Sequence, residues 1–177
     1  IEMILFLNCR ISFRRMIFIG AVGALTETFR LGDICTPVYS ISGSYADAYL
    51  MKESIRDSML FTRVVPDMNY VDQVIRIGKE KGHTIHKASV FCTPSIALEY
   101  YHLDEIISFG TDLIEMETSS FYLMTDLFEL PGIALLVVSD NSASGAALVG
   151  RNEEQQRQYD NGRNVVLPDM IISLAAE

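Results

Sequence analysis

The chain has 177 residues, 49% of them hydrophobic, which is enough for a single domain, 1–177, with a sizeable core. Its net charge of −9 and sequence pI ≈ 4.8 argue against nucleic acid or an anionic membrane as a partner, because such surfaces need concentrated Lys and Arg. Cys9, Cys35 and Cys92 lack the spacing of a metal site or a disulfide scaffold, so we expect free thiols, a cytoplasmic setting and no bound metal.

The N-terminal residues 1–7 are apolar, but charged residues follow too soon for a membrane span and no signal-peptide cleavage site is present. We interpret this segment as the end of a packed helix. Because the chain opens without Met and in the middle of a pattern, we also expect it to be the C-terminal part of a longer polypeptide.

Short apolar segments that predict strands alternate with helical patterns along the chain. The segments expected to be strands in the first half are 16–19, 32–42 and 83–92. After the first of them, Gly20 and Gly23 are expected to form a tight turn that lets a substrate approach the backbone.

Several helix boundaries are also readable. Asp67 marks the expected start of one helix, and Asp104 is expected to cap a short one. Residues 153–176 predict a C-terminal helical region that Pro168 splits or kinks. The small residues 142–145 are suited to a hinge or lid.

Three residues of chemical interest, Glu115, Met116 and Glu117, stand where a helical pattern begins that Pro131 later ends. At a helix start, Glu117 would stay ionised and could accept two hydroxyls of a sugar ring. Met116 could lie against the apolar face of that sugar. An acidic helix start is also ordinary complementation of the helix dipole, so a purely structural role stays open.

The continuous apolar run at 133–138 predicts a strand covered on both faces, as in the centre of a mostly parallel sheet. It ends abruptly in Asp140 and Asn141, and ligands collect just beyond the carboxyl ends of such strands. Burial there would raise the proton affinity of Asp140 and let it deliver a proton to a leaving group. An Asp after a strand is also common as a turn or cap residue, and the residues leave both readings open.

Motifs in this order resemble the signature of the nucleoside phosphorylase family, which includes purine nucleoside phosphorylases, uridine phosphorylases and methylthioadenosine/S-adenosylhomocysteine nucleosidases. They are IFIGAVGA at 17–24, LGDI at 31–34, IEMETS at 114–119 and VSDN at 138–141. The resemblance implies an α/β fold, a three-layer αβα arrangement with a central mixed, mostly parallel sheet. It also implies that the family's N-terminal phosphate-loop segment is absent from this chain.

For chemistry, the resemblance implies cleavage of the N-glycosidic bond of purine nucleosides, by phosphorolysis to free base and ribose 1-phosphate. Inorganic phosphate would be the co-substrate, and no cofactor is expected. Glu117 and Met116 would bind the ribose, Glu115 would help to shape the pocket, and Asp140 would protonate the purine at N7. A purine is favoured over uracil because a pyrimidine has no N7.

The resemblance adds further residues and a partner. Gly23 and Asn141 are expected to bind substrate, and Phe91 is the nearest match to an aromatic residue that stacks on the base, although core packing is an open alternative for it. Arg151 matches an Arg that swings onto the catalytic Asp in purine phosphorylases. A homo-oligomer, either a dimer or a hexamer, with sites shared between subunits is also implied.

One departure bears on the attacking group. Phosphorolytic relatives commonly have an Arg where Phe18 stands and a Ser or Thr where Ala21 stands, both serving the phosphate. Losing a charge-assisted donor and a hydroxyl together would weaken anion binding. A phosphate-independent nucleosidase and a non-catalytic nucleoside-binding protein are therefore kept as alternatives.

Overall fold

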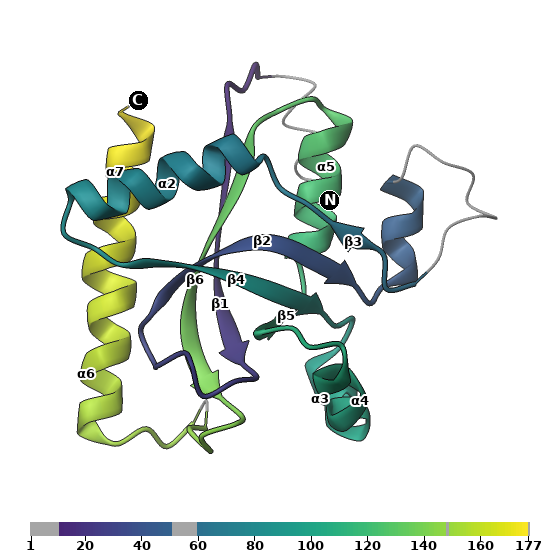
Figure 1. Cartoon of the computed structure of the whole chain (residues 1–177), viewed down its shortest axis with the longest axis vertical. Coiled ribbons are helices and arrows are strands. Elements are labelled where there is room, and N and C mark those ends of the chain that lie inside the picture. Colours follow the sequence, from purple (N-terminus) through teal and green to yellow (C-terminus); the bar gives the residue numbers. More distant parts are fainter. Residues whose placement is uncertain (1–10, 51–59, 148, 177) are drawn as a thin grey trace.

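The computed structural model describes residues 11–50, 60–147 and 149–176, and within them a six-stranded sheet is packed among helices (Figure 1). The strands are β1 (Met16–Ala24), β2 (Ile34–Ser42), β3 (Arg63–Val64), β4 (Ile85–Cys92), β5 (Leu113–Glu115) and β6 (Gly132–Asn141). The helices are α2 (Met68–Glu80), α3 (Ile96–Glu99), α4 (Leu103–Ser108), α5 (Thr118–Leu127), α6 (Glu153–Asn161) and α7 (Leu167–Ala175). Two 3-10 segments, η1 (Tyr45–Leu50) and η3 (Tyr100–His102), and a π-helical turn, η4 (Gly162–Val166), complete these elements. The helix expected at 1–7 and the thiol of Cys9 lie outside the described residues.

The sheet has the strand order β3-β2-β4-β5-β1-β6, and β2 also pairs with β6. The long ladders β1–β6 and β2–β4 are parallel, as is β4–β5, while β1–β5, β2–β3 and β2–β6 are antiparallel. A mixed α/β fold around a central sheet is therefore confirmed. The expected three layers are not clearly present, because the β2–β6 pairing closes five strands into a barrel-like ring instead of leaving an open sheet.

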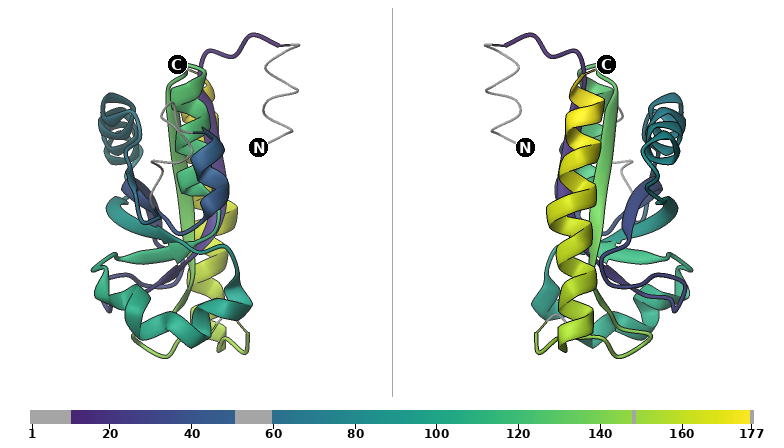
Figure 2. Two further views of the ribbon diagram at one scale, coloured as in Figure 1. Left: turned by 90° about the vertical axis from the view of Figure 1, so that its right-hand side faces the viewer. Right: turned by 90° about the vertical axis from the view of Figure 1, so that its left-hand side faces the viewer.

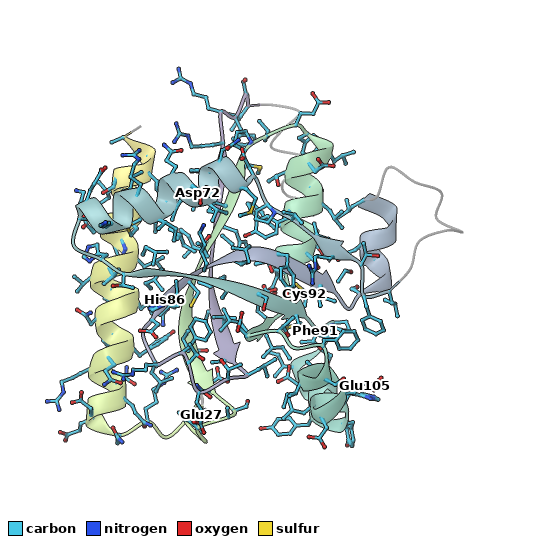
Figure 3. The ribbon with its side chains drawn as sticks, viewed as in Figure 1. Glu27, Asp72, His86, Phe91, Cys92 and Glu105 are labelled. Carbon is cyan, nitrogen blue, oxygen red and sulfur yellow. The ribbon has the colours of Figure 1, made fainter. Side chains whose placement is uncertain are left out.

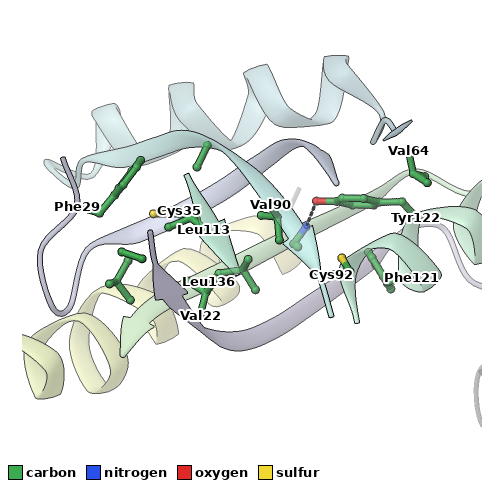
Figure 4. Close-up of a cluster of buried hydrophobic side chains, with 14 residues drawn as sticks. Val22, Phe29, Cys35, Val64, Val90, Cys92, Leu113, Phe121, Tyr122 and Leu136 are labelled. Atoms are coloured by element: carbon green, nitrogen blue, oxygen red, sulfur yellow. Dashed lines mark hydrogen bonds between the residues drawn. The ribbon is translucent and has the colours of Figure 1, made fainter. Parts of the chain in front are cut away.

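Strand β6 is buried on both faces, as its continuous apolar pattern predicts. On one face Leu136 belongs to a core cluster that includes Tyr122 of α5, whose hydroxyl accepts a hydrogen bond from the Ala134 amide at 3.3 Å (Figure 4). On the other face Leu135 packs in a cluster with residues of α2 and α7, among them Met170. The packing of both faces fixes the position at which the strand ends, and therefore the position of the polar residues there.

Helices cover the sheet from opposite sides. In Figure 1, α2 crosses above the sheet, α6 and α7 run down one flank and α5 lies at the other. The side views show α6, η4 and α7 following one another as one long helical rod beside β6 (Figure 2). In the described parts of the chain, no helix combines the length and the apolar character needed to span a bilayer.

The tight turn expected at Gly20 and Gly23 is wrong. Strand β1 continues through both glycines to Ala24, because Gly20 pairs with Leu136 in the parallel ladder with β6. The register shifts only between Val22 and Gly23, which is a bulge and not a chain reversal. The glycine pattern was therefore misread because the partner strand was not visible in the sequence.

The helix predictions have mixed outcomes. Asp67 caps α2, since its carboxylate accepts hydrogen bonds from the amides of Asn69 and Tyr70. Asp104 does not cap α4: it lies within the first turn, and His102 holds the N-cap position without a side-chain bond.

The break expected at Pro168 is a local change in helix type, and the helical rod continues through it. Pro168 lies in the first turn of α7, where its missing N–H is tolerated, and the helix widens into the π-helical turn just before it. Gly162 opens that turn and contacts the loop before β2, because a Cβ on Gly162 would come within 2.0 Å of the Gly32 carbonyl oxygen. The rod therefore stays continuous and is held close against the sheet.

Candidate active site

A pocket of about 260 Å³ opens beyond the carboxyl ends of β1, β5 and β6. The arrowheads of β1 and β6 both point toward this end of the molecule (Figure 1). The residues that line it include Gly23, Glu115, Met116, Glu117, Ser139 and Asp140. Five residues that the sequence marks as candidates, Gly23, Glu115, Met116, Glu117 and Asp140, therefore line one hollow.

Asp140 is held in place by its two neighbouring strands. The Ser139 hydroxyl donates to Asp140 Oδ1 at 2.6 Å and also reaches the Val22 carbonyl at 3.3 Å. On the β1 side, Gly23 is paired with Asp140, and a Cβ at this glycine would lie 2.9 Å from Asp140 Oδ2. One oxygen of the carboxylate is thus satisfied by a hydroxyl, while the other lies over a glycine.

Glu115 is a buried acceptor that organises the start of α5. Its carboxylate receives the amide of Glu117 at 2.8 Å and the hydroxyl of Thr118 at 2.8 Å. The amide of Thr118 donates to both carboxylate oxygens, at 3.0 and 3.1 Å, and the Cys92 thiol donates at 2.8 Å. Burial and the charge of Glu115 raise the pKa of the Cys92 thiol, which keeps it protonated as a donor. Glu115 therefore shapes the segment that carries Met116 and Glu117.

The backbone amides at the start of α5, which were expected to favour the ionised form of Glu117, donate their hydrogen bonds to the Glu115 carboxylate instead. Glu117 occupies the N-cap position of α5 but its side chain makes no capping bond, because Glu115 already takes the free amides. Glu117 is exposed as a residue, yet partial burial of its carboxylate and then the charge of Glu115 raise its pKa. Glu117 lines the pocket, where its carboxylate can accept hydrogen bonds from a ligand.

Behind the pocket lies a second buried carboxylate, Asp47. It is fully buried and accepts the hydroxyls of Ser42 and Ser119, each at 2.6 Å, and that of Ser120. These bonds tie η1 to the first turn of α5, directly after Glu117 in the chain. Asp47 supports the pocket wall without lining the pocket.

A second hollow of about 500 Å³ adjoins the first and shares Ile96, Glu99 and Asp140 with it. Asn141 lines this hollow, but its polar atoms already serve the protein. Its amide donates to the carbonyls of Thr26 and Phe29 at 2.9 and 2.8 Å, and its oxygen accepts from the Ser144 amide. In this structure Asn141 therefore joins two loops.

Arg151 lies near Asp140 but does not contact its carboxylate. The guanidinium donates to the Ser139 carbonyl at 2.7 and 3.2 Å and stacks 4.0 Å over the ring of Tyr159. The charge is thus held one residue away from Asp140, against the backbone of the same strand.

Phe91 does not line the pocket that holds Asp140. Together with Phe61 and Phe109 it lines an adjacent apolar hollow of about 360 Å³, with ring centroids 4.8 to 6.1 Å apart. Figure 3 shows Phe91 and Cys92 at the end of β4. On this side the pocket of Asp140 is lined by Ile96, which is 57% exposed.

The pocket is strongly acidic. Its carboxylates are Glu99, Glu115, Glu117 and Asp140, and no Lys, Arg or His lines it within the described residues. Across the same parts of the chain, no group of three His, Cys, Asp or Glu side chains is placed to hold a metal ion. The arrangement is suited to accept hydrogen bonds from hydroxyl or amino groups and to donate a proton from a carboxyl group.

Comparison with known proteins identifies the family to which this sequence belongs. The sequence model of the phosphorylase superfamily matches residues 3–166. The chain belongs to the phosphorylase superfamily.

Relatives within and around this superfamily differ in activity. DeoD-type purine nucleoside phosphorylases from Anoxybacillus flavithermus and Geobacillus stearothermophilus are each 24% identical over 160 residues, which is 88% of this chain. The chain spans 63% of the length of these curated relatives.

Among solved structures, the 5'-methylthioadenosine/S-adenosyl homocysteine nucleosidase of Campylobacter jejuni aligns with a TM-score of 0.67 at 15% identity, covering 89% of this chain and 68% of that one. AMP nucleosidase from Bacteroides thetaiotaomicron aligns with a TM-score of 0.65 at 20% identity, covering 94% and 67%. These structural likenesses agree with the phosphorylase-superfamily fold.

Among the pocket residues of this superfamily member that were not predicted from the sequence are Thr93, Ile96 and Glu99. They follow β4, so the rule that ligands collect beyond strand ends applied to them as much as to Asp140. Their signal was weak because β4 ends in a Thr-Pro-Ser turn and a four-residue helix, neither of which has a distinctive pattern.

Proposed function

We propose that the protein cleaves the N-glycosidic bond of purine nucleosides. The observation that carries this proposal is the placement of Glu117, Met116 and Asp140 around one pocket that continues into a second hollow. Cavities of about 300–1,000 Å³ are usual for small-molecule sites, and the joined hollows fall in that range. Membership of the phosphorylase superfamily supports the same chemistry.

Each residue has a distinct task in this proposal. Glu117 accepts hydrogen bonds from the ribose hydroxyls, and Met116 packs against the sugar ring. Asp140 protonates N7, so that the purine departs as a neutral base while positive charge develops on the ribose. Ser139 acts as a positioning residue, because its hydroxyl fixes one oxygen of Asp140.

Water is favoured as the attacking group. The pocket presents carboxylates and, within the described residues, no cation, so a phosphate ion would be repelled where water would not. Phe18 and Ala21, in place of the expected phosphate-binding side chains, point the same way. Phosphorolysis to ribose 1-phosphate is the second candidate, supported by the likeness to DeoD-type purine nucleoside phosphorylases.

Three further roles belong to the proposal. Ile96, and not Phe91, would contact the base, because Ile96 lines the pocket with Asp140 and Phe91 lines the adjacent apolar hollow. Arg151 would need to leave the Ser139 carbonyl to reach the Asp140 carboxylate during the reaction. The whole protein would work as a homo-oligomer on a purine nucleoside.

The test is a cleavage assay with adenosine, inosine and methylthioadenosine, each with and without phosphate, in which free base and sugar product are separated by chromatography. Free base and free sugar without phosphate are the expected result. Cleavage that requires phosphate and yields a sugar phosphate would support the second candidate. Absence of cleavage with every nucleoside would contradict the enzymatic proposal and leave nucleoside binding.

A further inference from the structure

The two joined hollows have distinct ends. Glu117 and Met116 line only the smaller one, whereas Ser142 and Gly145 line only the larger one. Asp140 lines both. If the sugar is bound at Glu117 and the base is protonated by Asp140, the base must extend past Asp140 into the larger hollow.

Glu99 is the other carboxylate that lines this base end. It projects from α3, is half-buried, and lines both hollows together with Asp140. Within the described residues its carboxylate has no hydrogen-bond or ion-pair partner, unlike Glu115 and Asp47. Burial and then the negative charge of Asp140 raise the pKa of Glu99, which agrees with a carboxylate held near a second one in a partly dry cavity.

Purines differ at the edge that carries N7. Adenine presents the N7 acceptor beside the N6 amino donor, whereas guanine presents N7 beside the O6 acceptor. A carboxylate is an acceptor, so it pairs with an amino group and repels a carbonyl oxygen. With Asp140 engaged at N7, a second carboxylate at the same end of the cavity meets the substituent on C6.

We propose that Glu99 is a specificity-determining residue that accepts a hydrogen bond from the 6-amino group and makes the site selective for 6-aminopurine nucleosides over 6-oxopurine nucleosides. The inference rests on the proposed function, since it assumes that the base lies beside Asp140. A hydrogen bond to a charged group contributes enough free energy to change the ratio of kcat/KM for 6-aminopurine to 6-oxopurine nucleosides by about 10- to 100-fold.

The test compares kcat/KM for adenosine and inosine in the wild type, in Glu99→Gln and in Glu105→Gln. Glu105 is a matched control, because it is exposed on α4 (Figure 3) and lines the apolar hollow that Glu99 also borders but neither of the two joined hollows. The wild type and the control are expected to prefer adenosine. Glu99→Gln is expected to lower the adenosine-to-inosine ratio by about 10-fold or more, since the amide can donate to O6.

An unchanged ratio in Glu99→Gln, or an equal fall of both kcat/KM values, would overturn the inference, because a merely structural residue affects both nucleosides alike. Calorimetric titration with free adenine and hypoxanthine separates this failure from failure of the proposed function. Should no nucleoside be cleaved, a preference for adenine that Glu99→Gln abolishes would still support the role of Glu99. Equal binding of the two bases, or binding of neither, would refute it.

Discussion

Gly23 of β1 and Asp140 of β6 are paired across the parallel ladder, and the space a side chain at Gly23 would fill is taken by the Asp140 carboxylate. A Cβ there would lie 2.9 Å from Asp140 Oδ2 and 3.2 Å from Ile114 Cγ2. Both are closer than ordinary van der Waals contacts. The glycine is therefore needed for the orientation of the acid, and no turn requires it.

This relationship predicts the effect of Gly23→Ala. The new methyl group should displace the Asp140 carboxylate, and a misplacement of about 1 Å can cost on the order of 100-fold in rate. We expect kcat to fall by about 10- to 100-fold. Gly20→Ala is the matched control, because Gly20 lies on the same strand and its Cβ would meet Phe18 and Leu136 away from the pocket. Equal activities of the two variants would show that Gly23 does not position Asp140.

Glu115→Gln tests the segment that carries Glu117. All four donors around the Glu115 carboxylate would face a group with one oxygen and one amino group, so at least one buried donor loses its acceptor. We expect a loss of about 1–3 kcal/mol in the free energy of unfolding, measured by urea denaturation. Asp104→Asn, at an exposed site, should leave stability unchanged. A stability of Glu115→Gln equal to the wild type would argue against this hydrogen-bonded centre.

Glu117→Gln should separate activity from stability. Partial burial and the charge of Glu115 raise the pKa of Glu117 in the folded state, so folding favours its protonated form. The contribution of Glu117 to the free energy of unfolding is present in full below the pKa that this residue has in the unfolded chain. It is lost as the pH rises through the higher pKa that Glu117 has in the folded protein. At pH 7 the variant should therefore melt slightly higher than the wild type, and this gain should vanish in acid below about pH 4, where the carboxyl group is protonated in both states. Its turnover should fall, because the amide binds the ribose hydroxyls less strongly.

The comparison needs melting curves at both pH values and the exposed variant Glu129→Gln as a control. A lower melting temperature of Glu117→Gln at pH 7 would mean that the ionised carboxylate is stabilised by its surroundings, contrary to the direction of its pKa.

The contact between the C-terminal helical rod, formed by α6, η4 and α7, and the loop before β2 can be tested at Gly162. A Cβ there would come within 2.0 Å of the Gly32 carbonyl oxygen, which is backbone and cannot swing away. Gly162→Ala should therefore cost about 1–3 kcal/mol through overpacking, despite the better helix propensity of Ala. Thermal melting against Asn161→Ala, one residue earlier and exposed, measures this cost. A melting temperature raised by Gly162→Ala would show that the helix does not rest on this loop.

Much of the site could be predicted from the sequence because its residues stand next to strong local patterns. The apolar run 133–138 fixed the place of Asp140, and the helical spacing after Glu117 fixed the opposite wall. The local pattern does not show which of two nearby carboxylates, Glu115 or Glu117, accepts the hydrogen bonds of the amides at the start of α5. Glu115 took the helix donors expected for Glu117, because its carboxylate reaches them from a buried strand.

Features set by distant pairing could not be predicted. The β2–β6 pairing that closes the sheet joins Ile34 to Val137, and nothing local to either segment signals it. For the same reason the glycines of β1 were misread as a turn. Glu99 was missed because its α3 has only four residues, too few for a helical periodicity to be recognised.

The most direct test of the central claim, that Asp140 drives departure of the purine by protonating N7, is to compare adenosine with 7-deazaadenosine, in which a C–H group replaces N7. The wild type should release adenine from adenosine and release base from the deaza analogue at least about 100-fold more slowly. Asp140→Asn should be slow with adenosine by a similar factor and lose little more with the analogue. Cleavage of 7-deazaadenosine by the wild type at the adenosine rate would contradict the account.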